Sequence, residues 1–550
     1  MKLNKVSKII ISVSFIGWII AGIFLFNSVS ANASNSSQTN IYKKIQLFNE
    51  VLFKLRENYV DELEIEELIN DAIEGMLKEV DPHTVYFTPD EFEKFSIDTK
   101  GEFGGLGISI DKRGDYITVV SPIEGTPAYR MGILAGDKII KVDGESIVGI
   151  DTDKSIKKMR GDPGTKVVIT ILRPGVKGEL DFEIIRDIIK IKSIPYAFKM
   201  DNGIGYIRIR RFNANTTKEL REKLDELETE GIRGLLIDLR SNPGGLLNEA
   251  INTVNEFVGK GKRVVFTKGR TKQANFEYYT KFNRIRSGYP VITLINGGSA
   301  SASEIFAGSL QDWDKGLVVG TTSFGKGSVQ RLFPLADGNG IKVTTAKYYI
   351  HSGRCIHKDI NDQLLKDERV RNGDISKEEI DEMREEAEKE NLKNIFHTEK
   401  GRVVYGGGGI NPDLEIEQSR LSDFEVDLRR KNIFFNYSVD YMIDYENEIK
   451  KDFTTSDDFV QDFLEYAKKD SLEYEQADID SSYSWIQNQL TCNIIGRKFG
   501  DLEQYKVAIQ EDTQLQETLE IFDKCAFLED MFIYVEEINK EKKELAENKE

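Results

Sequence analysis

The chain has 550 residues, 39% of them hydrophobic, and a formal net charge of −18. This length is too great for one hydrophobic core, so we expect roughly three or four domains. The acidic balance, without a long Lys/Arg run, argues against nucleic acid as a partner, because binding to phosphates depends on clustered positive charge.

The N-terminus has the pattern of a targeting segment. Three lysines precede an apolar run from Ile9 to Phe26, and the small residues of Ser30–Ala33 follow. Residues 1–33 are therefore predicted to be a signal peptide or a membrane anchor. In both cases the basic flank stays in the cytoplasm. We expect an exported, periplasmic or otherwise extracytoplasmic protein, held at the inner membrane if the segment is not cleaved.

The rest of the chain changes pattern several times. Residues 41–98 have helical periodicity, interrupted at Asp81–Thr84 (DPHT), where Pro82 cannot continue a helix. Residues 99–187 contain short alternating strands, two short helices and a glycine-rich loop. Apolar strands then alternate with amphipathic helices, which is typical of an α/β fold. A charged stretch over residues 359–395 and a helical region over residues 416–550 complete the chain.

The cysteines and histidines of the sequence do not form a pattern that would bind a metal or a cofactor. Cys355, Cys492 and Cys525 show no metal-ligand spacing, and the four histidines form no paired motif. Export would permit a disulfide between Cys492 and Cys525, but an odd count argues against a disulfide framework. We expect no metal, no cofactor and structural cysteines.

One segment has the pattern of a serine nucleophile. Residues 296–305 (NGGSASASEI) connect an apolar strand to a helix. The small residues allow a sharp turn that places a serine hydroxyl at a helix N-terminus, where free N–H groups stabilise a developing anion. Simple helix capping or tight packing is the alternative. The pattern alone does not distinguish Ser299, Ser301 and Ser303.

A second segment offers a general base. Lys326 lies between glycines in residues 323–330 (SFGKGSVQ). As a base it must be neutral, so its pKa must fall from about 10.4 towards about 7 to 8, which burial can cause. In a strand, Lys326 and Gln330 share one face, so Gln330 could hold the amine.

Two other interpretations of this segment fit less well. Gly320, Gly325 and Lys326 have the spacing of a phosphate-binding P-loop, but Gly327 replaces the Ser or Thr that would hold Mg²⁺. Ser323 and Lys326 match the SxxK motif of penicillin-binding enzymes, but the sequence has neither a KTG nor an SDN element.

These motifs, together with DLRSNPGG at residues 238–245, the Gly104–Gly107 loop and DPHT, resemble the carboxy-terminal processing proteases. The resemblance covers roughly residues 41–360 and 401–413. It implies an α/β, crotonase-like serine peptidase core with an inserted PDZ domain and flanking helical regions, α+β overall. The domains expected are a signal or anchor (1–33), an N-terminal helical region (41–98), a PDZ domain (99–187), a peptidase core (188–358 and 396–415), a charged helical insertion (359–395) and a C-terminal helical region (416–550).

The resemblance also implies roles in catalysis. Ser301 would be the nucleophile, Lys326 the general base and Gln330 the third member. The backbone N–H of Ala302 and one from Gly244 or Gly245 would form the oxyanion hole.

In the PDZ domain, the resemblance implies a site for a peptide C-terminus. The N–H groups of Leu106, Gly107 and Ile108 would hold the terminal carboxylate, and a substrate strand would add along Ile108–Ile110. Arg160 corresponds to a basic position that links peptide binding to the active site in some members; a surface salt bridge is the alternative.

We therefore expect a serine endopeptidase that binds the C-terminal tails of exported or membrane proteins and cleaves near them. A non-catalytic PDZ scaffold is the alternative, and a penicillin-binding type of acyltransferase at Ser323 is another. A Ser–His–Asp triad would need His83, His351 or His357. The charged insertion and the C-terminal region do not match the family core and could serve adaptor binding, homo-oligomer contacts or substrate gating.

Overall fold

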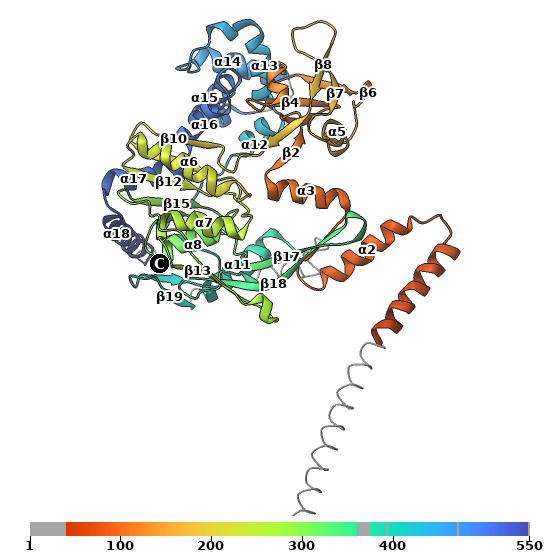
Figure 1. Ribbon diagram of the computed structural model, residues 1–550. Coiled ribbons are helices and arrows are strands. Elements are labelled where there is room, and N and C mark those ends of the chain that lie inside the picture. Colours follow the sequence, from red (N-terminus) through yellow and green to blue (C-terminus); the bar gives the residue numbers. More distant parts are fainter. Residues whose placement is uncertain (1–39, 360–374, 392–393, 470–471, 473, 548–550) are drawn as a thin grey trace, which may run out of the picture. The chain divides into compact units, whose positions relative to one another are not determined.

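A computed structural model describes residues 40–359, 375–391, 394–469, 472 and 474–547 (Figure 1). The predicted signal or anchor and much of the charged insertion lie outside these residues. The chain divides into two compact units, residues 1–80 and 81–550. In the first unit, residues 40–58 are helical and α2 spans Ile65–Lys78. No helix among the described residues combines the length and apolar character needed to cross a membrane.

The peptidase core is built on a six-stranded sheet with the order β10-β11-β12-β15-β16-β21. The pairs from β11 to β21 are parallel, and β10 is an antiparallel edge strand. The strands are β10 (Tyr196–Lys199), β11 (Ile204–Arg208), β12 (Gly234–Asp238), β15 (Val291–Ile295), β16 (Leu317–Gly320) and β21 (Leu414–Glu415).

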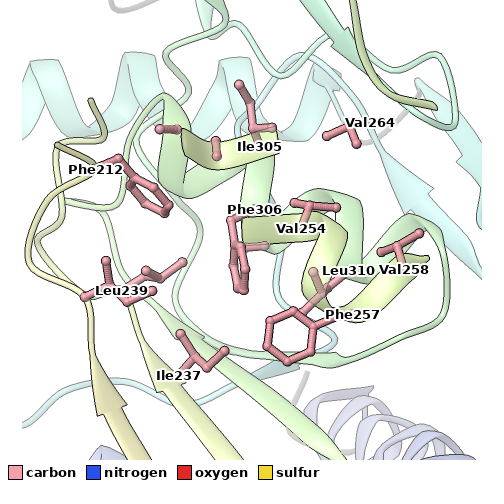
Figure 2. Close-up of a cluster of buried hydrophobic side chains, with 14 of the residues drawn as sticks. Phe212, Ile237, Leu239, Val254, Phe257, Val258, Val264, Ile305, Phe306 and Leu310 are labelled. Atoms are coloured by element: carbon pink, nitrogen blue, oxygen red, sulfur yellow. The ribbon is translucent and has the colours of Figure 1, made fainter. Parts of the chain in front are cut away.

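Both faces of this sheet are buried, which explains why its strands are continuous apolar runs. Leu235 and Ile237 of β12 face the helices α6 (Thr216–Thr229), α7 (Leu247–Val258) and α8 (Ala302–Asp312). Figure 2 shows part of this cluster, including Phe306 of α8. Leu236 faces the other way, towards α17 (Thr513–Lys524) and α18 (Leu528–Glu547).

A second sheet lies beside the first and carries the predicted lysine segment. Its order is β1-β18-β13-β14, and β17 pairs with β18. The strands are β1 (Val85–Phe87), β13 (Arg263–Lys268), β14 (Glu277–Tyr279), β17 (Ser328–Pro334) and β18 (Gly340–Ile350). The segment after Lys326 is therefore a strand, as predicted, and not the helix that a P-loop requires.

The inserted domain has its own sheet and its own apolar core. Its sheet has the order β3-β4-β5-β7-β8, with β6 paired to β5, and α3 and the short β2-β9 ladder connect it to the peptidase core. The elements are α3 (Pro89–Lys100), β2 (Glu102–Gly105), β3 (Ile108–Arg113), β4 (Tyr116–Pro122), α4 (Pro127–Arg130), β5 (Lys138–Val142), β6 (Glu145–Ser146), α5 (Thr152–Met159), β7 (Lys166–Leu172), β8 (Glu179–Ile185) and β9 (Asp187–Lys190).

The C-terminal region has two parts with different packing. Four helices share an apolar core of their own: α12 (Asp423–Arg430), α13 (Ile433–Tyr445), α14 (Asp457–Lys469) and α15 (Gln476–Phe499). The segment from α16 (Asp501–Ala508) to α18 packs on the core sheet instead. In the charged insertion, α11 spans Lys377–Asn391, followed by β19 (Ile395–His397) and β20 (Val403–Tyr405). The α/β core with an inserted domain and flanking helices confirms the predicted fold class.

Candidate active site

The three candidate serines have different environments at the start of α8. The hydroxyls of Ser299 and Ser303 are fully buried and donate to the carbonyls of Leu239 and Asn242, at 2.8 and 2.9 Å. Ser301 is partly exposed and has a φ of 56° and a ψ of −112°. A positive φ is unfavourable for a residue with a Cβ, and such strain is typical of functional positions. Only the Ser301 hydroxyl is placed to meet a substrate.

A buried carboxylate connects the serine segment to the lysine segment. Oε2 of Glu304, the third residue of α8, accepts hydrogen bonds from the backbone N–H groups of Ser301 and Lys326, at 2.7 and 2.9 Å. Oε1 accepts from the Ser323 hydroxyl and the Gly325 N–H, at 2.6 and 2.7 Å. Burial raises the pKa of the Glu304 carboxyl, and these four hydrogen bonds oppose that shift.

Glu304 was not among the predicted site residues, although a sequence signal was present. Ser301 and Glu304 have the S-x-x-E spacing of a capping box, in which the glutamate reaches back to the N-cap backbone. The further bonds to Ser323, Gly325 and Lys326 come from a segment that only the folded chain brings to α8.

Tyr348 of β18 is a second residue that the sequence did not indicate. Its hydroxyl donates to the carbonyl of Lys326 and lies close enough to the Ser301 side chain for Ser301 to lower its pKa. Only 2% of the residue is exposed. Burial raises the pKa of Tyr348 well above its usual value, so the hydroxyl stays protonated in neutral and moderately basic solution. Tyr348 therefore contacts both members of the predicted dyad.

The side chain of Lys326 is mostly enclosed, and burial lowers its pKa. The carboxylates of Glu304 and Asp81 oppose this shift. The direction is the one that a lysine base requires. In the described chain no hydrogen bond joins the Lys326 amine to the Ser301 hydroxyl. Catalytic hydrogen bonds are often long without substrate, so this observation is compatible with the predicted dyad.

Gln330 contacts the lysine segment and β18. Its amide donates to the Ser328 hydroxyl at 2.7 Å and lies 3.5 Å from the Thr344 hydroxyl. Thr344 donates in turn to Asp81 at 3.1 Å. No hydrogen bond from Gln330 to the Lys326 amine occurs within the residues described, so its role as a third member stays a prediction.

The predicted oxyanion loop lies against the start of α8. A Cβ added to Gly244 would lie 2.8 Å from the Ala302 nitrogen and from the Ser301 Cβ. The Gly244 N–H already donates to Asn242, at 2.9 Å. The Gly245 N–H donates to no other described residue, and Ala302, at the first position of its helix, has no intrahelical acceptor. This arrangement favours Gly245 over Gly244 as the partner of Ala302.

The glycine-rich loop of the inserted domain has the form of a carboxylate site. The carbonyls of Leu106 and Gly107 accept from Ala128 and Ile123, at 3.0 and 2.8 Å, so they point into the domain. The N–H groups of Leu106 and Gly107 donate to no residue in the described ranges. Strand β3, which begins at Ile108, is the edge strand of its sheet. Its free edge can accept an added peptide strand.

Arg160 follows α5 in the inserted domain. Its guanidinium stacks over the ring of Phe103 in β2, 4.6 Å from the ring centroid. The structure thus places it on an aromatic ring, and among the described residues it forms no surface ion pair, which was the alternative.

The surroundings of Ser323 and His351 argue against the two alternative catalytic sites, the SxxK type and the Ser–His–Asp triad. The Ser323 hydroxyl donates to Glu304 and accepts from the Ile410 N–H at 2.7 Å, and the residue is 4% exposed. It lies on a loop and not on the helix that an SxxK enzyme requires. The ring of His351 stacks on Trp313, with 3.6 Å between the centroids.

Comparison with known proteins assigns these features to a family. The model of peptidase family S41 matches residues 203–365, and a PDZ domain model matches residues 118–173. The carboxy-terminal-processing protease of Bartonella bacilliformis is 41% identical over 344 residues, 61% of this chain and 79% of that protein. The chain belongs to the carboxy-terminal processing protease family.

The chain is also similar to other proteins. The carboxy-terminal processing protease CtpA of Bacillus subtilis is 34% identical over 337 residues, 61% of this chain and 71% of that protein. A solved photosystem II D1 C-terminal processing protease is 28% identical and covers 57% of this chain and 90% of its own, with a TM-score of 0.32. Residues 425–500 match a family of unknown function. As a carboxy-terminal processing protease, the chain is a serine-type peptidase with a PDZ domain, and the scaffold alternative is excluded.

Proposed function

We propose that this peptidase binds the C-terminal tails of exported or membrane proteins in its PDZ domain and cleaves near them with a Ser301–Lys326 dyad. One observation carries the proposal: a single oxygen of Glu304 binds the backbone of both residues. The two backbone nitrogens therefore lie no further apart than the sum of two hydrogen-bond lengths.

The chemistry follows from this arrangement. The neutral Lys326 amine accepts the Ser301 proton as the serine oxygen attacks the scissile carbonyl. The N–H groups of Ala302 and Gly245 bind the oxyanion that forms; one such donor typically contributes about 10²- to 10³-fold in kcat. The protonated lysine then donates its proton to the leaving amine. Water hydrolyses the acyl-enzyme with the lysine acting again as base.

The PDZ domain supplies the substrate specificity. The unpaired N–H groups of Leu106 and Gly107 would bind the terminal carboxylate, and the peptide would add as a strand beside β3. We propose that residues 1–33 direct the chain out of the cytoplasm, as a signal peptide or an anchor, which would bring it to exported substrates.

The test compares the wild type with Ser301→Ala and Lys326→Ala on a peptide that has an apolar C-terminal tail. Both variants are expected to lose cleavage while their thermal unfolding stays unchanged. Ser287→Ala, an exposed serine on a loop of the core, is the control that should keep full activity. Undiminished cleavage by Ser301→Ala would rule out the dyad. Mass spectrometry of exported protein C-termini from cells with either enzyme then identifies the substrates.

A further inference from the structure

A network of charged side chains lies beneath the predicted oxyanion loop. Its centre is Asp238, the last residue of β12, which is fully buried. The carboxylate accepts hydrogen bonds from Arg208, from the Tyr206 hydroxyl at 2.8 Å and from the Arg240 side chain at 2.7 Å. Burial alone would raise its pKa, but the two guanidinium groups lower the pKa of Asp238 to about 2. Two positive charges thus face one negative charge at this point.

The C-terminal segment supplies the second negative charge. Asp512, the N-cap of α17, binds Arg240 through both oxygens, at 3.0 and 2.6 Å. Gln514 accepts a third bond from Arg240 at 3.1 Å, while its own amide donates to the Ile416 carbonyl at 2.6 Å. Arg240 is only 6% exposed. A bidentate pair fixes the direction of a guanidinium, and removing one partner leaves a buried charge uncompensated.

A second contact from the same segment is linked to the Asp238 carboxylate through Tyr206. The Tyr505 hydroxyl of α16 is 2.7 Å from the Tyr206 hydroxyl, which donates to Asp238. The Tyr505 ring also stacks on Tyr196 of β10, with 3.8 Å between the centroids. The segment from α16 to α17 therefore contacts the network at two residues, Tyr206 and Arg240.

Arg240 lies at the start of the loop that packs against the Ser301 segment. Two residues later, the Asn242 carbonyl accepts from the Ala300 N–H and the Ser303 hydroxyl, both at 2.9 Å. The clearance around Gly244 is small, since a Cβ there would lie 2.6 Å from the Ala300 carbonyl. A shift of Arg240 must therefore move the loop against the start of α8. Misplacement by about 1 Å can cost about a hundredfold in rate.

We propose that Asp512 is a positioning residue of the active site. It holds Arg240, and through Arg240 the loop that carries the Gly245 oxyanion donor, so the segment after residue 500 is part of the catalytic apparatus. The proposal rests on the proposed function for the role of Gly245. The S41 model ends at residue 365 and the model of unknown function at residue 500, so Asp512 lies in neither.

The experiment measures kcat and KM for a tail peptide with Asp512→Asn in the full chain. Asparagine caps a helix as well as aspartate does, so this change removes the charge and keeps the cap. We expect kcat to fall about ten- to hundredfold while KM changes less than twofold. Asp512→Glu keeps the charge and should recover most of the loss.

The matched control is Asp523→Asn. Asp523 lies on the same helix and forms an exposed ion pair with Arg233 of the core, away from the loop. It should leave kcat unchanged. An Asp512→Asn enzyme with kcat within twofold of wild type would overturn the proposal. An equal fall in kcat in Asp512→Asn and Asp512→Glu would also overturn it, if that fall matches the decrease in the folded fraction of each variant. Such a result would indicate a purely structural role. Retained activity in Ser301→Ala would instead contradict the proposed function.

Discussion

The backbone N–H groups of Ser301 and Lys326 donate to the same carboxylate oxygen of Glu304. Glu304 is 1% exposed and accepts two more bonds from the lysine segment through its other oxygen. One side chain therefore sets the distance between the start of the helix at the proposed nucleophile and the loop that carries the proposed base.

Glu304→Gln should separate this function from stability. A glutamine amide has only one acceptor oxygen. Its NH₂ group must therefore face two of the donor groups that form hydrogen bonds with the Glu304 carboxylate. We expect kcat for a tail peptide to fall about ten- to hundredfold and the free energy of unfolding to fall by about 1 to 3 kcal/mol. Steady-state kinetics and denaturant unfolding measure the two effects.

The matched control for this change is Glu219→Gln. Glu219 of α6 is a mostly enclosed carboxylate that accepts the Ile194 N–H at 2.9 Å, in a different part of the core. It should lower stability without a matching loss of kcat in the remaining folded enzyme. Equal losses of kcat in both variants would show that Glu304 has no particular role in catalysis.

Tyr348→Phe removes the hydroxyl that contacts the Lys326 carbonyl and Ser301. The loss of a hydrogen bond of about 1.4 kcal/mol corresponds to a tenfold fall in kcat. The shape of the pH profile should not change, because Tyr348 remains protonated throughout the assay range. Tyr349→Phe is the control, since the Tyr349 ring stacks on Phe266 on the other face of β18. A normal kcat in Tyr348→Phe would contradict this role.

The pH dependence tests Lys326 as the base. Because the base must be neutral, kcat/KM should rise as the pH increases through the Lys326 pKa, which burial lowers. The charged groups nearby are Glu304 on α8, Asp81 before β1 and Lys342 on β18. Burial by itself would raise the pKa of Asp81. Hydrogen bonds from Thr84, His83 and Thr344 lower that pKa, so Asp81 is an anion at neutral pH.

Asp81→Asn removes an anion that favours the charged amine, so the pKa of Lys326 should fall further. The rising limb of kcat/KM against pH is then expected to move to lower pH. Asp337→Asn, in the exposed turn between β17 and β18, should leave the limb in place. A limb that stays unchanged, or moves to higher pH, in Asp81→Asn would show that Asp81 does not act on the base.

Gly107→Ala tests the PDZ carboxylate site. Gly107 has a φ of 80°, and an added Cβ would lie 2.3 Å from the Thr126 Cβ, so the loop must move. We expect KM for a free C-terminal tail to rise about tenfold, a loss of about 1.4 kcal/mol in binding, with kcat at saturation unchanged. Gly114→Ala also places alanine at a positive φ, but it meets no atom within 4 Å. Peptide amidation should raise KM for the wild type and not for Gly107→Ala.

The amino-acid sequence determined the local parts of this protein. Alternating strands and helices, the small residues before α8 and the glycines around Lys326 are signals that lie within a few neighbouring residues. They were enough to predict the α/β core, the inserted domain and the two segments of the active site, because the turns and buried strands that they form depend on local backbone freedom and on apolar periodicity.

Only the tertiary structure decided which side chains meet. Ser299 and Ser303 differ from Ser301 because the loop after β12 accepts their hydroxyls. Tyr348 and Asp512 belong to the active site because a hairpin and a C-terminal helix return to it from far along the chain. Such contacts leave no local pattern: a buried carboxylate or tyrosine acquires its partners from packing between distant segments, and those partners set its charge and position.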